Sequence, residues 1–244
     1  MTGSSKMMAR ILGDLSAGSS SSPLGADPAQ CAHVLGVDGV AVSLGTNGTL
    51  PELMWSTAGR SALLEDAQFT LGEGPGLDAH RHRTLIVLPD LERGDTHRWP
   101  AFLPEAGRLG VRALFCLPLH VGGESLGVLT AQRSEPAPMD SVQMDDAFVL
   151  SAAITAALMR HDSWRDLFAG AEPQAVWHRA AVHQATGIIS VQAGVSLTEA
   201  MVMLRSHAYR TEEPLLKTAD AVVARRLHFR DNRDGTATEA GNRD

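Results

Sequence analysis

The side chains with the clearest capacity for chemistry are basic and aromatic residues that gather toward the C-terminal end of the chain. Guanidinium and ammonium groups bind phosphate, and a tyrosine ring can stack on an unpaired base, which is worth roughly 1–3 kcal/mol per base. The candidates are Arg205, Tyr209, Arg210, Lys217, Arg225 and Arg226. Residues of these types are also common on solvated helix surfaces, so their types alone leave both interpretations open.

Other patterns that could carry chemistry favour structural roles. The stretch Gly72–Gly76 lacks the Gly-Lys-Ser/Thr ending of a phosphate-binding loop, and Pro75 removes an amide, so a structural turn is expected. The histidines in His80–Arg83 have no third ligand nearby, which favours an exposed helix end or loop over a metal site. Cys31 and Cys116 lie in predicted core elements and have no thiolate-stabilising neighbour. We therefore expect no enzyme, no metal site and no cofactor.

Charge is distributed unevenly over the 244 residues, a length that suits two domains. Residues 1–174 carry 12 Lys and Arg against 20 Asp and Glu, whereas residues 175–230 carry seven against four. An acidic body repels nucleic acid, so any such contact is expected in the basic segment. The N-terminus has no signal-peptide pattern, and no apolar stretch approaches the roughly 20 residues of a membrane span. These features predict a cytoplasmic protein that does not contact a membrane.

The segment from Ala180 to Leu227 lies in a predicted bundle of three short amphipathic helices. Gly194 is expected to end the first, and Ser196 and Glu199 form a capping box that starts the second. Thr211 is expected to cap the third, with Glu212 and Glu213 in its first turn. The expected buried stripes are Trp177, Ala181, Gln184, Ile188 and Val191, then Leu197, Ala200, Met201, Leu204 and Ala208, then Leu216, Ala219, Val223 and Leu227.

The preceding part of the chain mixes predicted strands and helices. Helices are expected at 8–15, 28–36, 61–69 and 102–109, and strands at 40–44, 53–55, 85–88, 114–121 and 126–132. Asn47-Gly48 predicts a hairpin turn between the first two strands. An antiparallel sheet with flanking helices is an α+β domain.

A helical segment at 140–168 is expected to link the two parts. Its apolar stripe consists of Val142, Val149, Ala152, Ala156 and Met159, with Asp145 interrupting it. Such a stripe can pair with a second subunit or pack on its own sheet. A parallel dimer is the working hypothesis, and packing on the sheet is the alternative.

The α+β part resembles a GAF domain. The resemblance is carried by Gly72-Glu73-Gly74-Pro75-Gly76-Leu77-Asp78-Ala79, Pro89-Asp90-Leu91, Leu117-Pro118-Leu119 and Leu126-Gly127-Val128-Leu129. It is similar to the version that actinobacterial regulators place ahead of an ANTAR domain. The resemblance implies a module that senses a small molecule or light, or that serves dimerisation, so an unknown small-molecule ligand is a possible partner.

The C-terminal bundle resembles the ANTAR domain, an RNA-binding module of bacterial antiterminators. The matching residues are Ala185-Thr186-Gly187-Ile188, Gly194-x-Ser196-x-x-Glu199-Ala200, Leu204-Arg205, Ala208 and Ala219-x-x-Val222. The family usually has a basic residue where Thr186 stands. The resemblance adds Thr186 and Gly187 to the candidate RNA contacts and implies binding to stem-loops in nascent transcripts.

The domain plan that follows has five parts. Residues 1–24 form an N-terminal helix and connector, 25–138 a GAF sensor, 139–172 a linker or dimerisation helix, 173–230 an ANTAR domain and 231–244 a disordered tail. The predicted function is an RNA-binding antitermination regulator that acts as a homodimer. The alternative is a small-molecule-sensing protein whose bundle is a protein-interaction or dimerisation module. A helix-turn-helix DNA reader is disfavoured, because Glu199 or Glu212-Glu213 would stand at the start of its recognition helix.

Overall fold

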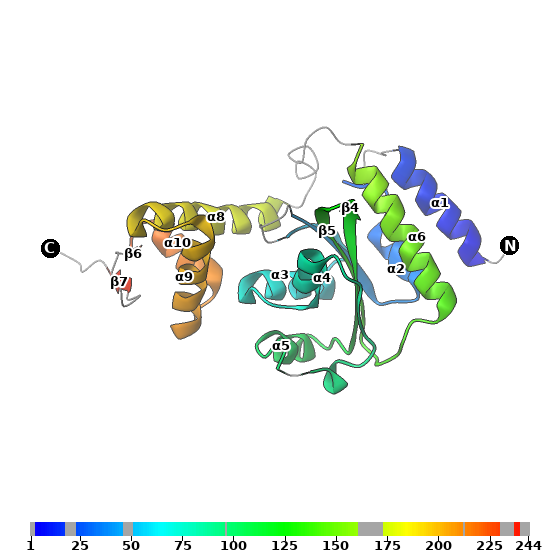
Figure 1. Cartoon of the computed structure of the whole chain (residues 1–244), viewed down its shortest axis with the longest axis horizontal. Helices are drawn as coiled ribbons and strands as arrows, with labels where there is room; N and C mark the ends of the chain where they lie inside the picture. The colour runs from blue at the N-terminus through cyan, green and yellow to red at the C-terminus, as the bar shows by residue number, and fades with distance from the viewer. Residues whose placement is uncertain are drawn as a thin grey trace. The chain divides into compact units, whose positions relative to one another are not determined.

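The computed structural model describes residues 3–17, 23–45, 51–95, 97–160, 173–211, 213–229 and 237–239. The chain forms two compact units, Met1–Ala171 and Glu172–Asp244 (Figure 1). The first holds α1 (Gly3–Ala17), α2 (Pro28–Leu35), β1 (Gly39–Leu44), β2 (Glu52–Ser56), α3 (Arg60–Leu71), α4 (Pro75–His82), β3 (Ile86–Leu88), the 3-10 turn η1 (Leu91–Arg93), α5 (Phe102–Arg108), β4 (Ala113–Val121), β5 (Glu124–Arg133) and α6 (Ser141–Leu158). The second holds α8 (Pro173–Ala193), α9 (Leu197–Arg210), α10 (Leu215–Val223), β6 (Leu227–Phe229) and β7 (Ala237–Glu239).

The first unit is built on an antiparallel five-stranded sheet in the order β2-β1-β5-β4-β3. Strands β1 and β5 are central and almost entirely buried, which explains why their sequences are apolar on both faces. Position 127 of β5 has room only for glycine, because the neighbouring strand β1 lies close to it. An added Cβ would lie 2.2 Å from the backbone oxygen of Ser43. The expected α+β fold with an antiparallel sheet is confirmed.

Helices cover both faces of the sheet (Figure 1). On one face α1, α2 and α6 share a core with the sheet, and α1 contributes the buried residues Met8, Ile11 and Leu15. On the other face α3, α4, α5 and η1 form a second core around Phe102 and Leu114. The N-terminal helix is therefore part of this unit's packing.

Helix α6 lies on its own sheet through one face and leaves another exposed. Its buried residues are Ala147, Leu150, Ile154, Ala157 and Leu158. The apolar stripe predicted from the sequence lies on the exposed side, where Val142 is 66% and Met159 59% exposed. Packing on the sheet thus uses a different set of side chains from the predicted stripe. The segment 161–172, included in the predicted linker, lies outside the described residues.

The glycine-rich stretch is a structural element, as expected, although the helix that it starts was not predicted. Pro75 begins α4, and Glu73 accepts hydrogen bonds from the amides of Ala101 at 2.7 Å and Phe102 at 2.9 Å, where α5 starts. Gly74 has φ +146°, and an added Cβ would lie 2.5 Å from the Gln68 side-chain oxygen. The expectation of an exposed His80 is wrong: its ring is buried and bonds Ser125 Oγ at 2.7 Å, since α4 packs on the sheet.

The second unit is a bundle of three helices, which confirms the predicted all-α architecture. Gly194 ends α8 with φ +67°, and the Ser196–Glu199 capping box starts α9. The predicted stripe of the first helix is wrong, because Val182, Ala185, Ile189 and Ala193 are buried while Val191 is 85% exposed. Apolar residues occur on more than one side of this sequence, so periodicity alone could not select the buried face. Of the predicted stripe, the side chain of Trp177 is outside the described set.

The third helix also differs from its prediction. Thr211 is the C-cap of α9, and α10 begins after Pro214, so the predicted N-cap is wrong. Of the predicted stripe, Ala219 and Leu227 are buried as expected, whereas Val223 is 36% exposed. Leu215, Thr218 and Val222 complete the buried face, because contacts with α8 and α9 select that side of the helix. Leu197, placed in the second stripe, is 62% exposed. Glu212 and Asn47-Gly48 lie outside the described residues.

The chain continues past α10 into a short pair of strands. Strand β6 pairs antiparallel with β7, so three residues of the predicted disordered tail, 237–239, form a strand. Leu227 and Phe229 of β6 are buried. The amide of Phe229 donates to the Gln192 side-chain oxygen at 3.0 Å, which ties the strand to the end of α8.

Candidate RNA-binding surface

The frame of the candidate surface is the corner between α8 and α9. The chain bends by 106° between the two helices, across the short turn at Gly194. Glu199 accepts from the Ser196 hydroxyl and amide, and these hydrogen bonds lower the pKa of its carboxyl below the usual value. The carboxylate therefore holds the start of α9 at neutral pH. The helix lies on α8 and α10 through Ala200, Met201, Leu204 and Ala208.

Tyr209 is the most exposed aromatic side chain of α9, with 79% of its surface accessible. Arg205 lies one turn earlier, at the i, i+4 spacing that brings side chains together on a helix surface. Burial lowers the pKa of the Arg205 guanidinium to about 10, which leaves it protonated at neutral pH. An exposed ring beside a partly buried cation can accept a base on its face and a phosphate at its edge.

Arg210 is held by residues that the sequence analysis did not select. Its Nη2 donates to His207 Nδ1 at 3.0 Å, and because arginine cannot accept, that nitrogen is unprotonated. The His207 ring meets Phe229 edge-on, with 5.6 Å between ring centroids. Strand β6 therefore supports the end of α9. The i, i+3 spacing of His207 and Arg210 was the available signal, whereas the Phe229 contact has no local signature.

The remaining basic candidates lie on or after α10. Lys217 forms an exposed ion pair with Glu213, so part of its charge is already used. Arg225 and Arg226 are exposed and follow the last turn, with their amides bonded to Val222 and Ala221 oxygens. Arg225 has φ 59°, a conformation that helix ends usually reserve for glycine. Within the described part of the chain, neither arginine makes an ion pair.

Thr186 and Gly187 take different positions although they are adjacent. Thr186 is 4% exposed, and its hydroxyl donates to the Val182 oxygen at 2.7 Å and lies 3.9 Å from the Met201 sulfur. The structure thus places Thr186 inside the bundle. Gly187 is partly exposed, and an added Cβ would meet nothing within 4 Å. Gly187 can therefore offer backbone to an external partner.

The first unit buries both of its cysteines and a small set of polar side chains. Burial raises the pKa of the Cys31 thiol to about 12 and raises that of Cys116 further, so both are unreactive at neutral pH. Ser43 donates to Glu65 at 2.7 Å, and Gln68 donates to the same carboxylate at 3.0 Å, beneath α3. Among the described residues, no three His, Cys, Asp or Glu are grouped to hold a metal ion.

Among the described helices, no single one is long and apolar enough to cross a membrane. Only α8 and α9 together reach the required length and composition, and they are bent by 106°.

The fold defines a two-domain protein with an antiparallel-sheet unit followed by a three-helix unit. The family model of the GAF domain matches residues 29–159, and that of the ANTAR domain matches residues 173–223. The chain belongs to the GAF domain family and carries an ANTAR domain after it. The two matches identify no catalytic domain.

Similar solved structures are isolated GAF domains. One from an Acinetobacter phosphoenolpyruvate-protein phosphotransferase is 15% identical, with 65% of this chain and 94% of that chain covered and a TM-score of 0.48. That of the corresponding Coxiella burnetii protein is 18% identical, with 65% and 95% covered and a TM-score of 0.46. At these identities the likeness concerns the fold alone. Among curated proteins, none matches the chain.

Proposed function

We propose that this protein is an RNA-binding regulator of transcription termination. Its ANTAR bundle binds paired stem-loops in nascent transcripts, and its GAF unit controls that binding. The observation that carries the proposal is the match to an ANTAR domain over residues 173–223, together with an exposed tyrosine and arginines on the same helices. Nascent transcripts place this action in the cytoplasm.

The proposed contacts are of two kinds: one recognises RNA bases, and the other binds the phosphate backbone. Tyr209 stacks on a base that a loop leaves unpaired, because single-stranded loops are where RNA sequence is accessible. Arg205, Arg210, Arg225 and Arg226 neutralise phosphates, and Gly187 allows close backbone approach. Lys217 contributes when it exchanges Glu213 for phosphate. Thr186 acts through packing in this proposal, since its side chain lies inside the bundle.

The mechanism is a competition between two RNA folds. A terminator and an antiterminator hairpin share bases, so a protein that binds only the antiterminator shifts the equilibrium by its binding free energy. Two bundles in a homodimer bind the paired stem-loops together, which raises the effective concentration of the second site. A small molecule at the GAF unit changes this outcome only if it binds the active and inactive arrangements with different affinities.

The test is a gel shift of the whole protein with an RNA that carries two hairpins, titrated with potassium chloride. The matched control RNA keeps both stems and replaces both loops. We expect log affinity to fall with log salt by roughly 0.7 for each phosphate contact, and the loop-replaced RNA to bind more weakly. Absence of binding at low salt would contradict the proposal. An affinity that changes neither with salt concentration nor with loop sequence would also contradict it.

A second candidate function is a protein-interaction module. It is favoured by the exposed apolar residues Val191 and Leu197, which flank the α8–α9 turn. Scattered apolar residues are normal on surfaces, so two residues support this function less than the ANTAR match supports RNA binding. Failure of the gel shift, combined with loss of a binding partner in a Val191→Ser, Leu197→Ser variant, would favour it.

A further inference from the structure

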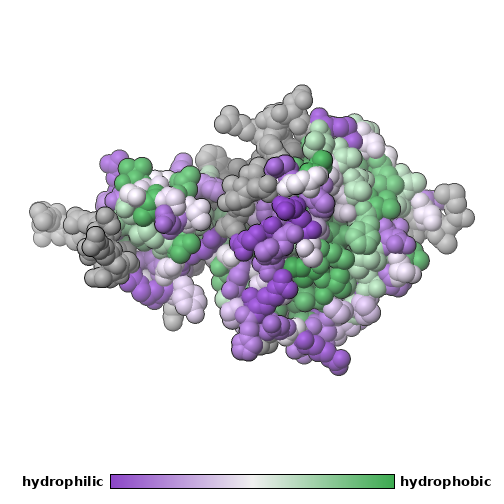
Figure 2. All heavy atoms as spheres, in the orientation of Figure 1, coloured by the Kyte–Doolittle hydropathy of each residue, from purple (hydrophilic) through white to green (hydrophobic). Residues whose placement is uncertain are grey.

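Helix α6 carries an outer seam that has the spacing of a coiled coil. We define the outer seam as Val142, Asp145, Val149, Ala152, Ala156 and Met159, which are spaced 3, 4, 3, 4 and 3 residues apart. All six are exposed, and exposed Phe148 lies beside them. Apolar side chains are visible over this part of the molecule in Figure 2. One apolar face of α6 packs on the sheet, so the outer seam is a second apolar face that the first unit does not cover.

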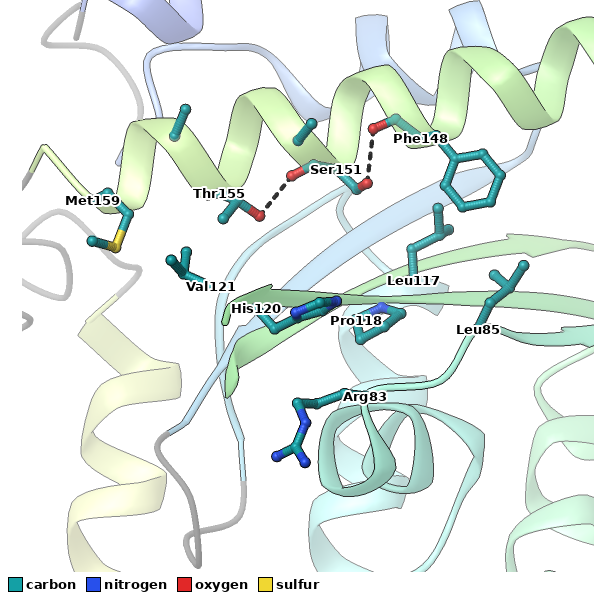
Figure 3. A pocket seen from close by; sticks show the side chains of 12 residues that line it. Arg83, Leu85, Leu117, Pro118, His120, Val121, Phe148, Ser151, Thr155 and Met159 are labelled. Carbon is teal, nitrogen blue, oxygen red and sulfur yellow. Dashed lines mark hydrogen bonds between the residues drawn. The ribbon is translucent and has the colours of Figure 1, made fainter. Parts of the chain in front are cut away.

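A groove runs between the C-terminal half of this helix and the sheet (Figure 3). Its volume is about 650 Å³, and it is lined by Phe148, Ala156 and Met159 from α6 and by Leu117 and Val121 from β4. Strand β3 pairs only with residues 114–116 of β4, so in the described chain the rest of that edge, up to residue 121, has no strand beside it. The groove and the outer seam therefore form one continuous, largely apolar surface.

Charge along this surface is polarised. The N-terminal half of α6 carries Asp145 and Asp146 after the capping residue Asp140, and residues 140–159 contain no Lys or Arg. At the opposite end Arg160 follows the helix, and its guanidinium donates to the backbone oxygens of Leu15 and Ala156. Arg83, which donates to the Gly123 oxygen, and His120 line the groove there. One end is acidic and the other is basic.

The charge distribution along α6 favours a second copy of the same helix as the partner, and it favours an antiparallel orientation of the two copies. A parallel pair of α6 helices would set Asp145 against its own copy and bring the two acidic ends together, which is repulsive. An antiparallel pair matches Val142 with Met159, Asp145 with Ala156 and Val149 with Ala152. In two of these three pairs a larger side chain meets an alanine, and each acidic end meets a basic end. In a two-fold interface each such pair occurs twice.

We propose that α6 forms the interface of a homodimer in which the two helices run antiparallel, with the two-fold axis midway along the outer seam. This rests on the homodimer of the proposed function and gives it a surface and an orientation. The 18 residues of α6 span about 27 Å, so the two chains leave the interface at opposite ends, roughly that far apart.

The experiment is disulfide trapping of the full chain without RNA, using Val142→Cys and Met159→Cys variants of different mass. In the antiparallel pair, residue 142 of one copy meets residue 159 of the other, whereas the two copies of residue 142 lie about 25 Å apart. We expect a mixed disulfide when the two variants are combined, and on the order of tenfold less product from either alone. Native Cys31 and Cys116 do not compete, because both are buried. Leu63→Cys, exposed on α3, is the matched control and should give only background.

Each other outcome overturns a definite part of the proposal. Efficient self-linking of Val142→Cys would establish a parallel pair, and a dimer by light scattering without either cross-link would place the interface elsewhere. A monomer at micromolar concentration would remove the homodimer altogether, while the gel shift still tests RNA binding separately. An Ala152→Glu variant, changed at an exposed position, should weaken dimerisation on the order of tenfold. An unchanged dimer in that variant would also overturn the proposal.

Discussion

Two arginines, one in each unit, end a helix in the left-handed conformation, yet their side chains have different surroundings. Arg83 follows α4 with φ 53°, and its Nη1 donates to the Gly123 oxygen at 3.1 Å. Arg225 follows α10 with φ 59°, and no hydrogen bond from its side chain is found within the described residues. This conformation costs an L-residue roughly 1–2 kcal/mol, so each position keeps an arginine where glycine would be less strained.

The same contrast extends to other polar residues. Arg133 of the first unit donates to the oxygens of Ala137, Pro138 and Gln143, and its guanidinium lies 5.5 Å from the Phe115 ring centroid. In the second unit Tyr209 and Arg226 face solvent. Arg133 therefore stabilises the first unit, whereas Tyr209 and Arg226 of the second unit leave their side chains exposed. Substitutions should affect stability in one unit and binding in the other.

The largest difference is expected between two glycines. In Gly127→Ala the new methyl group meets the Ser43 backbone oxygen, which cannot move without displacing β1, so the unfolding free energy of the first unit should fall by about 1–3 kcal/mol. In Gly187→Ala the methyl group meets open space, and the second unit should gain about 0.5–1 kcal/mol. Hydrogen-exchange mass spectrometry reads each unit separately. Equal losses in both variants would show that the two glycines are under the same packing constraint.

Tyr209 tests whether outward side chains bind RNA. Tyr209→Ala should weaken RNA binding by about 5- to 150-fold, the equivalent of one lost stacking interaction, and leave the unfolding midpoint almost unchanged. Tyr209→Phe is the matched control, because it keeps the ring and removes only the hydroxyl. Equal affinity of the alanine and phenylalanine variants in the gel shift would eliminate stacking as the role of this residue.

The two left-handed arginines give a matched pair of smaller effects. Arg225→Gly should raise the unfolding free energy of the second unit by about 0.5–1 kcal/mol and reduce the slope of log affinity against log salt by roughly 0.7. Arg83→Gly relieves similar strain but loses the bond to Gly123, so its net stability should change little. It removes no proposed phosphate contact, so the slope of log affinity against log salt should stay the same. Salt titrations of both variants test whether Arg225 contacts a phosphate. An unchanged slope for Arg225→Gly would exclude a phosphate contact there.

The sequence predicted where helices and strands lie better than it predicted which side of each helix is buried. The sheet strands, the start of α2 at Pro28 and the Ser196–Glu199 box were predicted because each depends on local residue types. The buried face of α8 was not, because apolar residues occur around much of this helix and only contacts with α9 and α10 select Ala185 and Ile189. For the candidate surface, residue type identified Tyr209 as a candidate but did not fix its exposure. The support of Arg210 by His207, which contacts Phe229, depends on a contact between distant residues.

Thr186 stands where the ANTAR family usually has a basic residue, yet its side chain is buried in the bundle. Its substitution by valine is expected to have the smallest effect of the variants proposed. Its hydroxyl bonds a helix carbonyl that already takes part in the α8 ladder, so Thr186→Val leaves no donor unpaired and should change the unfolding free energy by less than about 1 kcal/mol. RNA affinity should stay within about twofold, because the side chain does not reach the surface. Thr186→Lys is the complementary variant: it restores a basic residue but must bury or displace an ammonium group, and should destabilise the bundle. A marked loss of RNA affinity in Thr186→Val at unchanged stability would mean that the bundle opens at this position to bind RNA, and that α8 is not the rigid support that its packing indicates.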